Sequence, residues 1–244
     1  MKKVAVLILI VAVCESLAAQ ISVGLLAGNN FSKIKDNTDY KKYTDLISPD
    51  VEEYFFTNGL FVGIPVEISF TNKLSLLTTF SFLQKGTKFN KTISFTEDYI
   101  QTGDGKATSN YLELPVQTKF YLYRKKFRIY AMAGPEFGYL ISIIDDYELS
   151  IYNSTTGIST SESIDSKRKF NDLKHSGYNR LDVSFTIGTG CDYKVGIGNI
   201  SLNFSYVNGL TNLLKQGDGF AEGPKQYNRG FTVSAGYVIP LLIK

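Results

Sequence analysis

Residues 112–122 read Leu-Glu-Leu-Pro-Val-Gln-Thr-Lys-Phe-Tyr-Leu, and this segment carries the clearest signal of the fold. Apolar side chains and Thr118 occupy the even positions, whereas Glu113, Gln117 and Lys119 lie at odd positions between them. Successive side chains of a β-strand point to opposite faces, so this alternation is typical of a strand with one apolar and one polar face. The stretch therefore predicts a strand that separates two different environments.

The same alternation recurs along the chain and predicts an all-β protein. Apart from residues 112–122, it is found at 21–27, 60–70, 74–82, 127–141, 181–193, 200–206 and 231–239. None of these segments carries a charge on its apolar face. The composition agrees, because 14% aromatic residues, no Trp and 21 Gly favour strands and turns over helices. We therefore expect eight strands.

Short and long connections alternate between the expected strands. Residues 72–73, 124–126 and 196–199 are tight polar or glycine-containing turns, whereas 32–58, 86–110, 143–178 and 208–229 are long. Four long loops are unusual in a compact soluble domain, but outer-membrane barrels have them on the outer side. The pattern predicts an eight-stranded antiparallel transmembrane up-and-down β-barrel with short periplasmic turns and four long extracellular loops.

The polar face has the composition of a narrow barrel lumen. Besides small Gly, Ser and Thr residues it carries five acidic and five basic side chains, a balance suited to pairing inside a closed space. Tyr and Phe lie near the strand ends of the apolar face, as in the aromatic girdles of membrane barrels. A soluble barrel or sandwich, with the apolar face as its core, is the alternative. The charged residues are Glu67, Lys85, Glu113, Lys119, Arg128, Glu136, Arg180 and Asp182, with Asp192 and Lys194 further along.

Local features refine this picture. Pro65, Pro115 and Pro135 lie inside expected strands, where the missing N–H predicts bulges. Ser48-Pro49 is a candidate start of a short helix within the aromatic and acidic stretch 40–56, which is a candidate contact surface. Residues 150–166 are rich in Ser and Thr and are expected to be mobile.

The N-terminal 19 residues are typical of a secretory signal peptide. Lys2 and Lys3 precede the ten-residue apolar stretch 4–13, and the small residues Ser16, Ala18 and Ala19 follow. A transmembrane anchor needs about 20 apolar residues, twice this length. Cleavage at Cys14 as a lipoprotein is disfavoured by the bulky Val13 before it. We expect a cleaved leader at 1–19 and one barrel domain at 20–244.

Several motifs resemble the PorT-like family of outer-membrane β-barrels of Bacteroidota. They are Tyr111-Leu112-Glu113-Leu114-Pro115-Val116, Ala133-Gly134-Pro135-Glu136, Tyr206-Val207-Asn208-Gly209 and Asn228-Arg229-Gly230-Phe231. The resemblance spans nearly all of the chain after the leader and implies an eight-stranded outer-membrane barrel. The family's namesake assists a protein secretion system of that phylum, while most members have no assigned role.

Catalytic and metal-binding patterns are weak. One His and two Cys are too few for a typical zinc site or a disulfide framework, and we expect no cofactor. His175, with Ser176 beside it and Asp172 nearby, is the one candidate for an enzyme at the barrel rim, but neighbours in a loop do not form an oriented catalytic group. Glu113 and Glu136 are better interpreted as members of a structural ion-pair network than as an acid–base pair.

The sequence therefore favours a non-enzymatic outer-membrane barrel with a structural or interaction role through its outer loops. An accessory of protein secretion or envelope assembly is the second hypothesis, and a rim enzyme using His175 is the third. The expected partners are outer-membrane lipid and envelope or secretion proteins. The net charge of +3 gives no nucleic-acid footprint, and we expect a monomer.

Overall fold

The computed structural model describes residues 20–36, 49–96, 99–169, 172–174, 177–215 and 225–241. Within these ranges the strands form one antiparallel sheet of ten strands, accompanied by a short 3-10 helix, Asp172–Lys174. No helix among the described residues is long and apolar enough to cross a membrane.

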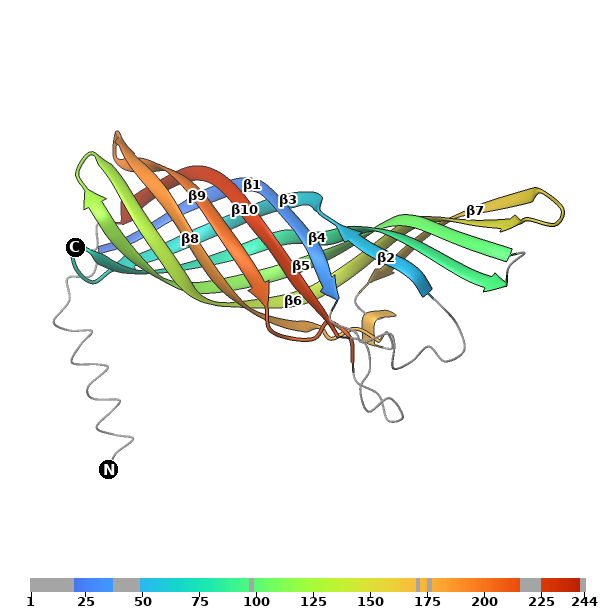
Figure 1. Ribbon diagram of the computed structural model, residues 1–244. Coiled ribbons are helices and arrows are strands. Elements are labelled where there is room, and N and C mark those ends of the chain that lie inside the picture. Colours follow the sequence, from blue (N-terminus) through green and yellow to red (C-terminus); the bar gives the residue numbers. More distant parts are fainter. Residues whose placement is uncertain are drawn as a thin grey trace, which may run out of the picture.

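Eight of the strands close into a ring (Figure 1). Around the ring the order is β1-β10-β9-β8-β6-β5-β4-β3, and β3 pairs again with β1. The first and last strands pair from Ile21 opposite Leu241 to Asp36 opposite Gln226. The eight predicted strands and the up-and-down topology are thus confirmed. The ring strands are β1 (Gln20–Asp36), β3 (Thr57–Ser69), β4 (Leu74–Thr96), β5 (Tyr99–Arg124), β6 (Phe127–Asn153), β8 (Leu181–Val195), β9 (Gly198–Gly209) and β10 (Gln226–Leu241).

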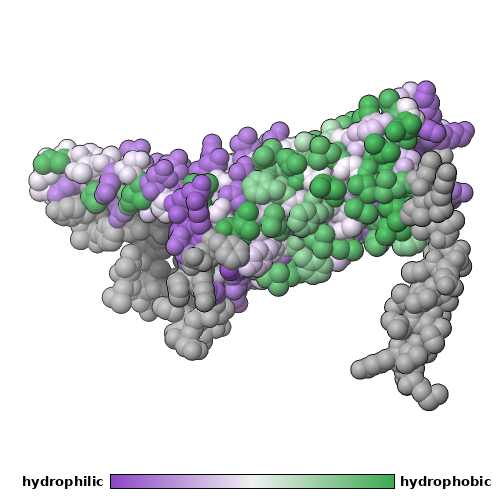
Figure 2. Space-filling model, turned by 180° about the vertical axis from the view of Figure 1, so that it is seen from behind, coloured by the Kyte–Doolittle hydropathy of each residue, from purple (hydrophilic) through white to green (hydrophobic). Residues whose placement is uncertain are grey.

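The apolar face of the ring points outward and the polar face inward. Ile64, Phe80 and Leu202 are about half exposed, whereas Ser75 and Glu113 are buried. Figure 2 shows hydrophobic residues gathered in a band over the barrel, with hydrophilic residues towards its ends. A soluble barrel would hold its apolar side chains inside, so that alternative is wrong. The ring therefore has an apolar belt on its outer surface and polar side chains in its interior.

Three strands continue well beyond the ring. With 23, 26 and 27 residues, β4, β5 and β6 are far longer than the roughly 9–11 residues that cross a bilayer. β2 (Pro49–Phe55) pairs with the far part of β4, and β7 (Ile158–Lys169) pairs with the far part of β6. Figure 1 shows this part of the sheet projecting from one end of the barrel. We call it the extension, and its end of the barrel the extension end; the opposite end, with residues 70–73, 125–126 and 196–197, is the turn end.

The extension corrects three expectations about the long connections. Much of 86–110 and 143–178 is strand, not loop, and residues 158–166, expected to be mobile, belong to β7. The proposed helix start at Ser48-Pro49 is wrong, because β2 begins at Pro49. The projecting strands do not separate lipid from a polar lumen, so they lack the apolar alternation that reveals a barrel strand. Backbone pairing between β4, β5 and β6 therefore continues beyond the residues that show apolar alternation.

The prolines interrupt the ladder without producing bulges. Near Pro65, pairing of β1 with β3 stops after Val23 opposite Val66 and resumes at Leu26 opposite Gly63, in the same register. Pairing is skipped in the same way beside Pro115 between β4 and β5, and beside Pro135 between β5 and β6. The predicted bulges are therefore wrong: the missing N–H removes pairs on one side of the strand, and no residue is inserted.

Candidate functional site

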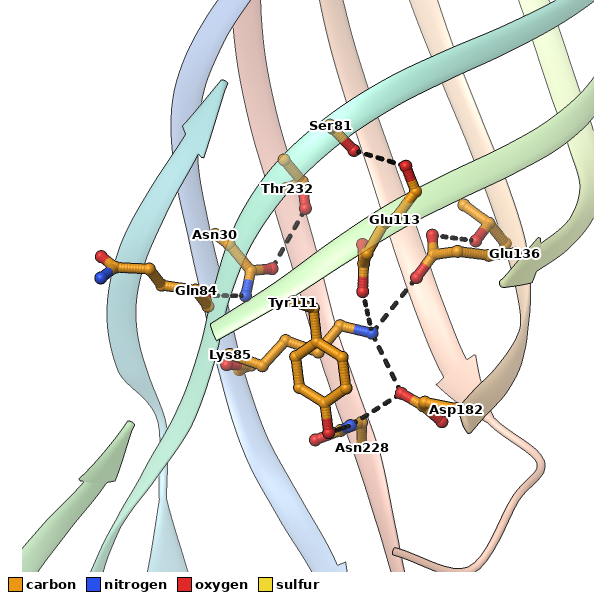
Figure 3. A network of polar contacts seen from close by, with 12 residues as sticks. Asn30, Ser81, Gln84, Lys85, Tyr111, Glu113, Glu136, Asp182, Asn228 and Thr232 are labelled. Carbon is orange, nitrogen blue, oxygen red and sulfur yellow. Dashed lines mark hydrogen bonds and ion pairs between the residues drawn. The ribbon is translucent and has the colours of Figure 1, made fainter. Parts of the chain in front are cut away.

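Eight of the ten charged side chains predicted to face the lumen form two separate clusters, one towards each end of the barrel. The first is the extension-side cluster, drawn in Figure 3. Lys85 Nζ lies 2.6 Å from Glu113 Oε1, 3.2 Å from Glu136 Oε1 and 3.2 Å from Asp182 Oδ2. All four side chains are buried and come from β4, β5, β6 and β8. One ammonium group thus joins three carboxylates and four strands.

Neutral side chains complete the extension-side cluster. Asn228 Nδ2 donates to Asp182 Oδ2 at 2.8 Å, and Thr186 Oγ1 donates to Glu136 Oε2 at 2.9 Å. Lys85 Nζ also lies 5.2 Å from the centre of the Tyr111 ring. These contacts spread the negative charge, yet the formal balance remains one cation against three carboxylates.

The turn-side cluster holds as many strands together with a different balance. Lys119 Nζ lies 2.9 Å from Glu67 Oε2 and 3.3 Å from Asp192 Oδ2. Arg128 Nη2 lies 3.4 Å from the same Asp192 oxygen. Tyr121 donates to Glu67 Oε1 at 2.6 Å, and the remaining Asp192 oxygen accepts from a serine hydroxyl. Two cations therefore face two carboxylates, and each carboxylate oxygen has a donor.

Side chains close the lumen between the clusters. Leu77, Tyr121, Tyr130 and Met132 pack together beside the turn-side cluster, and Lys119 Nζ lies 3.7 Å from the centre of the Tyr130 ring. The adjoining cavity, lined by Glu113, Glu136 and neighbouring residues, measures about 50 Å³. Such a volume holds one or two water molecules. The described barrel is therefore plugged by its own side chains.

The structure separates the eight predicted lumen charges into different surroundings. Glu113 and Glu136 lie with Lys85 and Asp182, not with Lys119 or Arg128, which belong to the other cluster. Glu67 belongs with Lys119. Arg180 lies with its guanidinium carbon 4.6 Å from the centre of the Tyr139 ring.

Sequence reasoning missed two contributors to the extension-side cluster, Tyr111 and Asn228. Both lie just outside the alternating segments that define the expected strands, although each is the first residue of a quoted PorT-like motif. In the structure they are buried in β5 and β10, whose pairing extends past the alternating segments. Extending the expected strands by a few residues beyond the alternating segments would have placed Tyr111 and Asn228 in the barrel.

The proposed enzymatic residues are less informative. His175 and Ser176 lie outside the described residues. Asp172 begins the 3-10 helix, and its carboxylate accepts a hydrogen bond from the Lys169 backbone N–H at 3.2 Å. Within the part of the chain that the structure describes, no group of three or more His, Cys, Asp or Glu side chains is arranged to hold a metal ion.

The fold is similar to that of several solved bacterial surface proteins. Ail of Yersinia pestis, in complex with the heparin analogue sucrose octasulfate, is 15% identical with a TM-score of 0.36, and the match covers 90% of this chain and 99% of Ail. OprG of Pseudomonas aeruginosa is 10% identical with a TM-score of 0.44, covering 92% and 97%. The protease OmpT of Escherichia coli is 12% identical with a TM-score of 0.47, covering 93% and 99%.

Comparison at the level of sequence identifies the family. No curated protein matches this chain significantly. The family described as "Outer membrane protein beta-barrel domain" matches residues 16–215. A closed ring with an apolar belt and short turns at one end is the architecture of such proteins. This chain therefore belongs to the outer membrane protein beta-barrel domain family and is a β-barrel of the bacterial outer membrane.

Proposed function

We propose that this protein is a non-enzymatic interaction protein that binds its partner through the extension on the extracellular side. The observation that carries this proposal is the continuation of β4, β5 and β6, joined by β2 and β7, past the length that a bilayer requires. A barrel that served only as a membrane plug would need no strands beyond the membrane. The extension is a hydrogen-bonded platform for contact outside the cell.

The tip of the β6–β7 hairpin is built to present apolar side chains. Ile151, Tyr152 and Ile158 are 46%, 44% and 63% exposed. The turn between these strands is fixed by Asn153, whose side chain accepts from two backbone N–H groups, and by Gly157 with a φ of 69°. Exposed apolar residues on an ordered tip are typical of a contact surface.

An ion pair supports the same hairpin near the barrel. Arg168 of β7 binds the Asp145 carboxylate of β6. Partial burial opposes the charge of Arg168, but the hydrogen bond and charge of Asp145 raise the pKa of the guanidinium above its ordinary value. The pair fixes the base of the hairpin, so the tip is held at a defined distance from the membrane.

The barrel itself contributes a structural lumen and a lipid-facing belt. Its lumen charges bind one another, which favours a structural network over catalysis. We propose that it works without a cofactor, does not bind nucleic acid and contacts outer-membrane lipid along its belt. We also propose that it acts as a monomer, because every strand of the ring is paired on both sides. We also propose that residues 1–19 are cleaved on export, which the mass of the mature protein tests.

Photocrosslinking on intact cells tests the interaction role. A photoreactive amino acid replaces Tyr152 at the tip, and a matched variant carries it at Leu202 on the apolar belt. We expect a defined protein or glycan adduct from position 152 and only lipid adducts from position 202. A second chain, in which 146–165 is replaced by Asn-Gly, should still shift on heating in gels but no longer bind the partner identified by crosslinking. Unchanged partner binding by this shortened chain would overturn the proposal.

A role as an accessory of secretion or envelope assembly is the second candidate, supported by the PorT-like motifs quoted above. It assigns the contact to the periplasmic turn end. Loss of secreted cargo in a deletion strain, restored by the chain lacking 146–165, would favour this role over the first. Membership of the PorT-like group of Bacteroidota belongs to this proposal.

A rim enzyme using His175 is the third reading. The H175A variant separates it from the other two, since we expect full function from that variant. Complete loss of function would favour the enzyme.

A further inference from the structure

A second and larger cavity lies at the periplasmic mouth of the barrel. It measures about 210 Å³ and lies on the turn side of the Lys119 cluster. Typical drug-sized ligand pockets measure about 300–1,000 Å³, so this cavity fits a smaller group. Its polar lining is formed by Gln20, Ser22, Glu67, Ser69, Lys119, Arg128, Asp192, Lys194 and Asn199.

The carboxylates in this cavity are already bound. Both Glu67 oxygens accept, one from Tyr121 and one from Lys119. Asp192 accepts from Ser201 through one oxygen and binds Lys119 and Arg128 through the other. Glu67 and Asp192 therefore have little capacity left to attract a further cation.

Two of the cations, Arg128 and Lys194, have N–H donors that are not used by the carboxylates of the cavity. Arg128 carries five N–H donors, and a single nitrogen of its guanidinium contacts Asp192. Lys194 follows Asp192 by two residues on the same strand, so both side chains point to the same face. It is exposed, and among the described residues no carboxylate lies within ion-pair distance of it. Arg128 lies opposite Asp192 in the β6–β8 register, so Arg128 and Lys194 are diagonal neighbours facing the cavity.

The surrounding end of the barrel is positively charged. The described residues there are 20–23, 66–77, 118–132, 190–201 and 236–241, and Glu67 and Asp192 are their only carboxylates. Lys125 and Lys126 lie near the rings of Tyr123 and Tyr193, which are exposed on the outer face. The outward lysines therefore lie near the membrane interface, while Arg128 and Lys194 face the mouth.

We propose that the periplasmic mouth is a binding site for a small phosphate-bearing anion, held by Arg128 and Lys194. Arginine binds phosphate oxygens through parallel N–H donors, and lysine adds a point charge. Asn199, Ser22 and Gln20 lie in the same cavity as neutral polar partners. The phosphate belongs either to the headgroup of an inner-leaflet phospholipid or to a soluble phosphate ester of the periplasm.

Calorimetric titration tests the site in protein refolded in octyl glucoside, which carries no phosphate. Glycerol 3-phosphate is titrated at 150 mM NaCl, where the Debye length is about 8 Å and loose surface attraction is screened. Native mass spectrometry with phosphatidylglycerol tests the lipid source in the same detergent. Retention of the lipid alone assigns the site to a headgroup, binding of the glycerol phosphate assigns it to a soluble ester, and either result supports the site. Binding of neither anion overturns it.

Matched variants locate the binding. We expect K194Q to weaken binding at least tenfold and R128Q together with K194Q to abolish it, while K125Q together with K126Q leaves it unchanged. K194Q keeps the test valid if R128Q fails to fold, because Lys194 lies outside the ion-pair cluster. Equal losses in the inward and outward variants would indicate diffuse attraction to a basic rim and would overturn the proposal.

Discussion

The two charged clusters of the lumen both pair a buried lysine with buried carboxylates, but they differ in how many cations support them. On the extracellular side, Lys85 alone joins three buried carboxylates. On the periplasmic side, Lys119 and Arg128 share two carboxylates. Each cluster links four strands, so each contributes to closing the ring. The stability of the extracellular end therefore depends on one cationic side chain, Lys85, whereas that of the periplasmic end depends on two, Lys119 and Arg128.

Removal of Lys85 should have the largest effect. K85M leaves Glu113, Glu136 and Asp182 buried without a cation, and breaking a buried ion pair costs about 3–5 kcal/mol of unfolding free energy. Urea unfolding in phospholipid vesicles measures the loss, with the folded fraction read from the heat-dependent gel shift. K88M, an exposed lysine on the same strand, is the control. A loss below about 1 kcal/mol, the worth of an exposed pair, would contradict the single-cation account.

Removal of Lys119 should cost less than removal of Lys85. In K119M, Asp192 keeps Arg128 and Ser201, and Glu67 keeps the Tyr121 hydroxyl. We expect a loss of about 1–3 kcal/mol, the cost of leaving charged groups partly satisfied. The same unfolding assay measures it. If K119M and K85M lost equal stability, the two clusters would not differ in redundancy.

Neutralising one carboxylate should act in opposite directions at the two ends. E113Q lowers the excess of carboxylates around Lys85, so we expect unchanged or slightly higher stability, within about 1 kcal/mol. D192N removes an acceptor shared by Lys119, Arg128 and Ser201, so we expect a loss of about 1–2 kcal/mol. The pair is compared by unfolding at pH 7. A larger loss for E113Q than for D192N would reverse the charge assignment.

The smallest effect is expected in the extension. R168Q breaks the partly exposed pair with Asp145, and such pairs contribute about 0.2–1 kcal/mol. The barrel should unfold at nearly the same urea concentration, while proteolysis of β7 in the folded protein becomes faster. A shift of the barrel transition as large as that of K119M would mean that extension and barrel unfold as one unit.

Outcomes along the strands show how far sequence patterns reach. Residues 112–122 and the other alternating segments predicted all eight ring strands, because a strand between lipid and a polar lumen must alternate. The same logic failed at 86–110 and 158–166, where the strands extend past the apolar belt and no alternation between lipid and lumen is required. The prediction of bulges at the prolines was wrong for another reason. A strand can accommodate a missing N–H either by a bulge or by skipping pairs in the same register, and only the observed strand register distinguishes the two.

The composition of the lumen was readable from the sequence, but its partners were not. Alternation placed Glu67, Lys85, Glu113, Lys119, Glu136 and Asp182 on the polar face. Which cation lies beside which carboxylate depends on the stagger of strands around the ring, and this brings Lys85 and Asp182 together across 97 residues of chain. Local patterns carry no information on that stagger, so the division into two clusters was out of reach.

The sequence alone indicates a β-barrel with an apolar outer face and a charged interior, because side-chain alternation is a property of single strands. Tertiary structure decided the rest: the extension, the separate clusters and the cavity at the periplasmic mouth. Each of these arises where strands distant in the sequence lie side by side, and ring closure fixes that registry.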